Sequence, residues 1–127
     1  MKEYPKEYAK DFIKKSEIFL EIARKNLDLY PEESAFNATQ SIINTNDAFT
    51  VYTINKRATK DHREALFLHK EAIKKIGDSS KLDIVQKGLE LRESTEYDVR
   101  KTISKNDAEI LVKKAERFLN WVKTFIK

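Results

Sequence analysis

Residues 34–55 read SAFNATQSIINTNDAFTVYTIN and contain a single charged residue, Asp47. Charged residues make up 36% of the 127-residue chain, so a segment of this length would be expected to carry about eight charges. Its apolar positions keep helical spacing, which predicts a helix from about Glu32 to Arg57 with Ala35, Ala38, Ile42, Phe49 and Tyr52 on one side. A helix without charges is usually buried on more than one side. We therefore expect the central helix of a bundle or the seam of an oligomer.

Four amphipathic helices are predicted around this segment. The first begins near Pro5 and stops at Tyr30–Pro31, because the residue before a proline avoids the α region. The other three open with capping boxes, which are Asp61 with Glu64, Ser80 with Asp83, and Ser104 with Asp107. Gly77 is a typical stop for the helix that starts after Asp61. Short connections favour antiparallel neighbours, so we expect an all-α, up-and-down bundle of four to five antiparallel helices, dimeric, with residues 1–127 as one domain.

Composition excludes several classes of protein. The absence of Cys rules out disulfides, thiolate nucleophiles and Cys-ligated zinc. There is no apolar signal core and no membrane-spanning run, which predicts a cytoplasmic protein without a membrane partner. The net charge of +4 is small and interspersed. The nearest approach to a basic stripe is in the last helix, where Glu109 and Glu116 dilute the cations Lys113, Lys114, Arg117, Lys123 and Lys127.

A polar stripe runs along the charge-poor helix. Its members are spaced three or four residues apart and share one face, beside the apolar one: Asn37, Gln40, Asn44 and Asp47. Buried amides and carboxylates are costly unless they find partners. Two interpretations stay open: a hydrogen-bond network between helices or subunits, or the lining of a polar ligand cleft.

Arg92 continues the spacing of Leu82, Val85 and Leu89, so it is expected along an apolar stripe. A guanidinium offers a planar fork of donors that suits a phosphate or a carboxylate. The alternative is a structural pairing with a buried acid, for which Asp47 is the candidate. His62 and His69 lie one heptad apart without an acidic cluster, so the sequence predicts neither a metal site nor a cofactor.

Three segments together resemble the HEPN domain family (higher eukaryotes and prokaryotes nucleotide-binding). They are the run Leu91-Arg92-Glu93-Ser94-Thr95-Glu96-Tyr97-Asp98, the start of the last helix at Ser104–Glu109 with Ala115–Phe118 beyond it, and the triplet Asp61-His62-Arg63. The resemblance covers nearly the whole chain. It implies a helical bundle that is usually a homodimer, and either a nucleotide- or RNA-binding protein or a metal-independent ribonuclease. Many such ribonucleases are toxins paired with a small nucleotidyltransferase.

The chain departs from the pattern of the active members, which have Arg, four to six residues, and then His. Arg92 matches the Arg, but Tyr97 stands at the His position and Glu93 follows the Arg. A tyrosine with a pKa near 10 is a poor base at neutral pH, and Glu93 places negative charge beside a bound phosphate. We therefore expect a homodimer that binds a nucleotide or RNA, with Arg92 on the phosphate and Tyr97 positioning the ligand.

Other residues complete this expectation. Asn44 and Asp47 would line the same cleft and orient Arg92, and His62 is a further candidate contact. The open alternatives are a ribonuclease that uses Arg92 with Tyr97, and a dimeric interaction scaffold without enzymatic activity.

Overall fold

Five helices build the molecule in the computed structural model, which describes the backbone of residues 1–97 and 102–126 and the side chains of residues 1–91 and 102–126. The helices are α1 (Ala9–Asn26), α2 (Pro31–Ile54), α3 (His62–Ile76), α4 (Leu82–Tyr97) and α5 (Lys105–Lys123). A 3₁₀ turn, η1 (Lys6–Tyr8), precedes α1. Two short strands, β1 (Lys2–Glu3) and β2 (Lys56–Arg57), pair antiparallel. The predicted all-α fold is confirmed.

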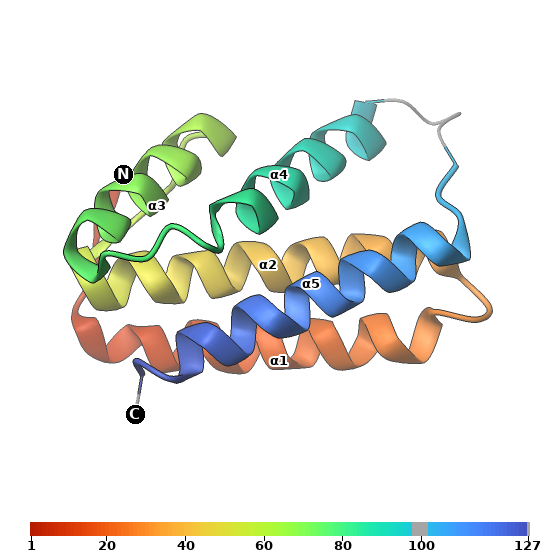
Figure 1. Cartoon of the computed structure of the whole chain (residues 1–127), viewed down its shortest axis with the longest axis horizontal. Coiled ribbons are helices and arrows are strands. Elements are labelled where there is room, and N and C mark those ends of the chain that lie inside the picture. Colours follow the sequence, from red (N-terminus) through yellow and green to blue (C-terminus); the bar gives the residue numbers. More distant parts are fainter. Residues whose placement is uncertain (98–101, 127) are drawn as a thin grey trace.

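The charge-poor helix α2 lies at the centre of the bundle. It contacts each of the other four helices, with α1 and α5 along one side and α3 and α4 on the other (Figure 1). Ile42, Ala48 and Phe49 of α2 are completely buried. The prediction of a central helix is confirmed, because four neighbouring helices leave α2 little surface on which charged side chains could stay hydrated.

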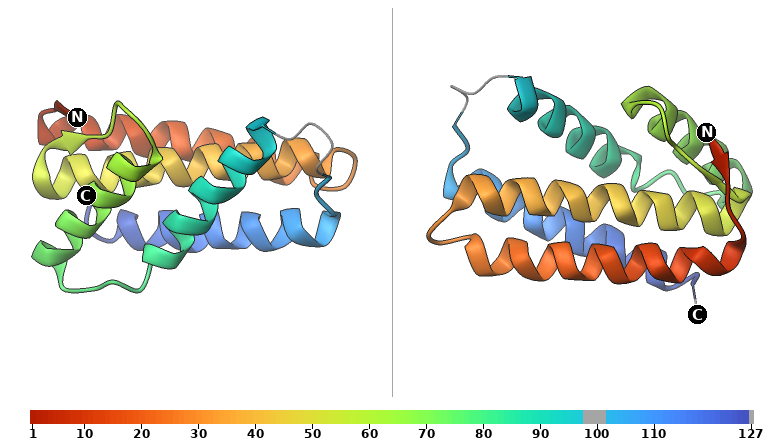
Figure 2. Two further views of the ribbon diagram at one scale, coloured as in Figure 1. Left: turned by 90° about the horizontal axis from the view of Figure 1, so that it is seen from above. Right: turned by 180° about the vertical axis from the view of Figure 1, so that it is seen from behind.

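Ion pairs between α1 and α5 fix the direction of the last helix. Lys105 at the start of α5 binds Asp28 just beyond α1, with Nζ and Oδ1 2.6 Å apart. Lys123 at the end of α5 binds Glu17 at 3.0 Å. Helix α5 is therefore antiparallel to α1 and runs in the same direction as α2, while α3 and α4 provide the connection between α2 and α5 (Figure 2).

Helix ends confirm two of the three predicted capping boxes. The Asp61 carboxylate accepts from the N–H of Glu64 at 2.9 Å, and the Ser104 hydroxyl accepts from Asp107 at 3.1 Å. Gly77 ends α3 in the left-handed conformation, at φ +80°. The third box, at Ser80, is wrong. Helix α4 begins at Leu82, and the Ser80 N–H donates instead to Asp78 Oδ1 at 2.8 Å.

Two predicted boundaries at the same end of the bundle differ from the structure. Helical structure does begin directly after Pro5, but as the 3₁₀ turn η1, and the α-helix starts at Ala9; α2 ends at Ile54 rather than near Arg57. Asn55 takes a left-handed conformation, which asparagine tolerates better than most residues. The N–H of Tyr4 donates to the Asn55 carbonyl at 3.0 Å and thereby draws the chain into the β1–β2 ribbon.

Candidate functional site

The end of α4 carries the predicted Arg92–Tyr97 motif. At Gly88 this helix comes so close to α2 that a Cβ on the glycine would lie 3.1 Å from Ile42 Cγ2. Arg92 follows one turn later, and Tyr97 is the last residue of α4. Beyond Gly88, α4 rises away from α2 toward its C-terminal end (Figure 1). The side chains of Arg92, Glu93 and Tyr97 lie outside the described residues.

Helix α3, which begins with His62, packs against α4. His62 is the first residue of α3 and is half-buried. Asp61, the residue before His62, caps the N-terminus of α3. The hydrogen bond from the Glu64 N–H to the Asp61 carboxylate therefore fixes the first turn of the helix. Three predicted site residues have described side chains on helices that contact α4: His62 on α3, and Asn44 and Asp47 on α2.

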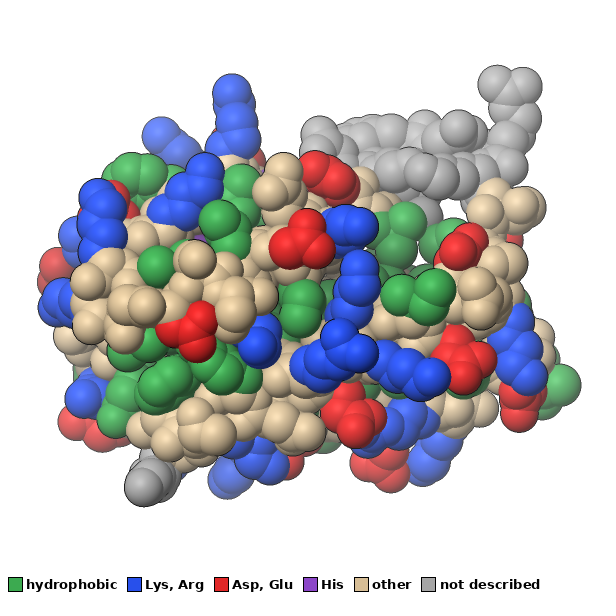
Figure 3. Space-filling view, in the orientation of Figure 1, with side chains coloured by type: hydrophobic (Ala, Val, Ile, Leu, Met, Phe, Trp, Pro, Cys, Tyr) green, Lys and Arg blue, Asp and Glu red, His purple; other side chains and the backbone are tan. Residues whose placement is uncertain are grey.

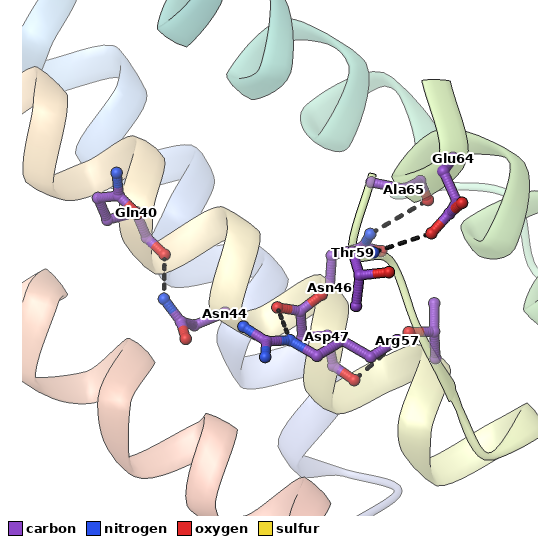
Figure 4. A network of polar contacts seen from close by, with 9 residues as sticks. Gln40, Asn44, Asn46, Asp47, Arg57, Thr59, Glu64 and Ala65 are labelled. Atoms are coloured by element: carbon purple, nitrogen blue, oxygen red, sulfur yellow. Dashed lines mark hydrogen bonds and ion pairs between the residues drawn. The ribbon is translucent and has the colours of Figure 1, made fainter. Parts of the chain in front are cut away.

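The polar stripe of α2 is bonded mostly to its own helix (Figure 4). Asn44 Nδ2 donates to the carbonyl of Gln40 at 2.9 Å, and Asn37 Nδ2 donates to that of Glu33 at 2.8 Å. Asp47 binds Nε of Arg57, from β2, at 3.1 Å. Arg57, and not an arginine of α4, is thus the described partner of Asp47. The expected network between helices does not run through Asn37 and Asn44.

Burial and pairing act differently on the pKa values of Asp47 and Arg57. Burial raises the pKa of Asp47 to about 6, against the lowering effect of the Arg57 guanidinium and of Lys15. Burial by itself would lower the pKa of Arg57, but the Asp47 carboxylate raises it, and the net shift is upward. The guanidinium carbon lies 4.8 Å from the centroid of the Phe12 ring, a cation–π arrangement that favours the charged form.

Two interhelical polar contacts were missed by the sequence analysis. The Ser16 hydroxyl of α1 donates to the carbonyl of Ser41 at 2.9 Å and also contacts the Ser41 and Thr45 hydroxyls of α2. Asn46 of α2 binds His69 of α3, with Oδ1 and Nδ1 2.8 Å apart. A signal for both was present, since Ser16 and Asn46 each lie one turn after a buried residue of the apolar stripe.

His69 is neutral and enclosed. Its partner Asn46 donates through Nδ2 to the Ala65 carbonyl at 3.3 Å, so the Asn46 oxygen is left to accept the proton on His69 Nδ1. Nε2 is buried without a hydrogen-bond partner among the described residues, beside the rings of Phe49 and Phe118. Burial lowers the pKa of His69 to about 4. This histidine serves packing, and it is not placed to exchange protons with a ligand.

The described part of the chain has neither a cluster of metal ligands nor a membrane-spanning helix. It holds no group of three His, Cys, Asp or Glu residues arranged to bind a metal ion. It also holds no helix with the length and apolar content that crossing a membrane requires.

The chain was compared with known proteins. The HEPN domain family model matches residues 9–125, which is nearly the whole sequence and includes the end of α4. No curated protein matches it significantly.

Proposed function

The chain belongs to the HEPN domain family, and from this premise we propose that it binds a nucleotide or RNA at the C-terminal end of α4, with Arg92 as the phosphate contact. The place of Arg92 carries the proposal. It lies one turn beyond the Gly88–Ile42 contact, which holds α4 against the centre of the bundle. A guanidinium suits a phosphate because its donors form a planar fork.

Tyr97 and His62 are the proposed companions of Arg92. Tyr97 ends α4, where its ring would stack on a base or donate a hydrogen bond. His62, at the start of the adjacent α3, would be a second polar contact. The Glu93 carboxylate would repel a bound phosphate, and so it would lower the affinity for the ligand rather than raise it. Asn44 and Asp47 are assigned an indirect role, because their described partners are Gln40 and Arg57.

Metal-independent RNA cleavage at the same site is the second candidate function. The surroundings of the two histidines favour His62 as its general base. The chain has two histidines. His69 is fully buried and its pKa is lowered to about 4, so it cannot serve as a general base. His62 is then the histidine that could act beside Arg92, where Tyr97 replaces the expected histidine. Cleavage of RNA in EDTA that His62→Ala abolishes would support this candidate.

A homodimer through the outer face of α1 and α2 is part of the proposal. Lys15 of α1 acts electrostatically on Asp47, so this side of α1 lies next to the polar stripe of α2. On the same side of α1, Ile18 and Ile22 are 57% and 38% exposed. Exposed isoleucines beside a charge-poor helix are typical of a surface that a second copy covers.

The toxin–antitoxin role is proposed on family grounds alone. In that role the partner would be a small nucleotidyltransferase. Co-expression of the chain with a nucleotidyltransferase encoded beside it tests this part. Copurification as a stable complex would support the pairing, and separate elution would contradict it.

A thermal-shift experiment with ATP, GTP and short RNA tests binding. A ligand at 100 times its dissociation constant adds about 2.7 kcal/mol of stability, which is readily measured as a rise in Tm. Arg92→Ala is expected to abolish the rise. The matched control is Arg24→Ala, which removes the same charge from an exposed ion pair with Glu116 on α1 and α5. A rise that survives in Arg92→Ala would contradict the proposed site.

A further inference from the structure

Helix α5 carries cations on two different sides, which the fold separates. On the side toward α1, Lys105 and Lys123 are paired with acids of that region, and Glu116 is paired with Arg24. These residues neutralise one another in the α1–α5 contact. The sequence mixes them with the remaining cations of α5, which is why the helix looked evenly charged.

On the opposite side of α5, the positive charges of the described residues are not neutralised by ion pairs. Lys114 and Arg117 lie one turn apart on this side, the first half-buried and the second exposed. Neither forms an ion pair or a hydrogen bond with the described part of the chain. The acids that precede and follow Lys114 in sequence are engaged elsewhere, since Glu109 binds Lys113 at 3.5 Å and Glu116 binds Arg24.

An aromatic side chain continues this line along α5. Trp121 lies four residues after Arg117, and Lys81 Nζ sits 5.6 Å from the centroid of a Trp121 ring. One part of the indole packs on Phe118 and Phe125, and Trp121 remains partly exposed. Asp78 accepts a hydrogen bond from the Ser80 N–H at 2.8 Å, and Trp121 and Lys81 also lower the pKa of its carboxyl, so this acid lies beside both. In Figure 3, Lys and Arg side chains gather across the middle of the face formed by α4 and α5.

We propose that Lys114, Arg117, Lys81 and Trp121 form a track for the sugar–phosphate backbone of a single-stranded RNA. Cations in a row attract successive phosphates regardless of sequence. Lys114 and Arg117 have no partner in the described part of the chain, and Lys81 donates to the Ser80 hydroxyl at 3.2 Å. A partly exposed indole offers a stacking surface to a base. The track runs from the middle of α5 toward its C-terminal end, where Lys81, just before the start of α4, lies against Trp121. The inference rests on the proposed function, and it identifies the ligand at Arg92 as an RNA chain rather than a free nucleotide.

The test compares two probes by fluorescence anisotropy in EDTA. One is a labelled oligouridine of about twelve nucleotides, a length within the site sizes of single-strand binders. The other is a labelled ATP analogue. The variant is Lys114→Gln with Arg117→Gln. Its matched control is Lys10→Gln with Lys14→Gln, which removes two exposed lysines from α1. Circular dichroism verifies that both variants are folded.

The expected result is selective loss of RNA affinity. The α5 variant should bind oligouridine at least tenfold more weakly, and the slope of log K against log salt should fall by about 1.4, since each phosphate contact contributes about 0.7. Its affinity for the ATP analogue should be unchanged, and the α1 control should resemble the wild type. Arg92→Ala should lose both probes.

Each other outcome overturns a different claim. Unchanged oligouridine binding by the α5 variant, or an equal loss in the α1 control, overturns the track. Displacement of the RNA by polyglutamate at equal charge concentration would overturn it in favour of an acidic protein partner. If the wild type binds neither probe, the proposed function fails and the track fails with it.

Discussion

Asp47 accepts a hydrogen bond from Nε of Arg57 at 3.1 Å, and this contact joins the centre of α2 to the strand that follows the helix. The two partners differ in exposure, since 6% of the Asp47 side chain and 34% of the Arg57 side chain reach solvent. The pair therefore holds the one charge of the central segment at the boundary between core and surface. It also fixes the β1–β2 ribbon at one end of the bundle.

Removing the acid should destabilise the fold. Asp47→Ala leaves Arg57 without its carboxylate, and breaking a buried pair costs about 3–5 kcal/mol. Because Arg57 is one-third exposed and can turn toward water, we expect about 1–2 kcal/mol in urea unfolding. The double variant Asp47→Ala with Arg57→Ala should lose less than the sum of the two single losses. Additive losses would show that the contact contributes nothing.

Protonation of His69 and protonation of Asp47 should change the free energy of unfolding in opposite directions. The pKa of His69 is lowered from 6.5 to about 4, so acid favours the unfolded chain, which binds the proton first. Stability from this group is lost as pH falls from 6.5 to 4, by about 3 kcal/mol. The pKa of Asp47 is raised from 3.8 to about 6, so the folded state binds that proton first and gains stability as pH falls through this range.

Asp47→Asn should therefore make the protein more sensitive to acid. With the opposing group removed, the free energy of unfolding should fall by about 3 kcal/mol between neutral pH and pH 4, while the wild type changes much less. Urea titrations at several pH values measure both curves. Adding His69→Gln to the Asp47→Asn background should flatten the curve again. Parallel curves for wild type and Asp47→Asn would refute the compensation.

Gly88 should be intolerant of a side chain. Alanine favours a helix by about 1 kcal/mol, but its Cβ would lie 3.1 Å from Cγ2 and 3.2 Å from Cδ1 of the fully buried Ile42. Overpacking of this kind costs about 1–3 kcal/mol, so Gly88→Ala should be destabilising on balance. In an Ile42→Ala background the same change should become neutral or stabilising, as measured by urea unfolding. An equal cost in both backgrounds would mean that the glycine serves another purpose.

Self-association should depend on the outer face of α1. Ile22→Lys places a charge on the proposed dimer surface and should shift the protein toward the monomer in sedimentation equilibrium. The control is Ile110→Lys on α5, where the isoleucine is 45% exposed and lies outside that face. Asn44→Leu should likewise change the oligomeric state or stability. A monomeric wild type, or equal effects of both lysine variants, would contradict the dimer surface.

The fold was predictable because its main determinants are local. Capping at Asp61 and Ser104 and the left-handed glycine Gly77 act within a few residues, and each is confirmed. The absence of charge in α2 correctly predicted its central position.

The polar contacts were harder to predict because they join distant segments. The pairing of Asp47 with Arg57 involves strand β2, which pairs with residues at the start of the chain, where Tyr4 bonds to Asn55. The contact of Asn46 with His69 depends on how α3 packs against α2. Periodicity shows which side of a helix is buried, but it does not show which residue of another segment forms the hydrogen bond on that side. The separation of charges on α5 likewise follows from the position of α1.

The most direct test of the central claim is an anisotropy titration of labelled oligouridine, in EDTA, against wild type, Arg92→Ala and Arg24→Ala. The account predicts that wild type and Arg24→Ala bind with similar affinity. Arg92→Ala should bind at least tenfold more weakly, which corresponds to about 1.4 kcal/mol. Equal binding by all three proteins would contradict the assignment of Arg92 as the phosphate contact.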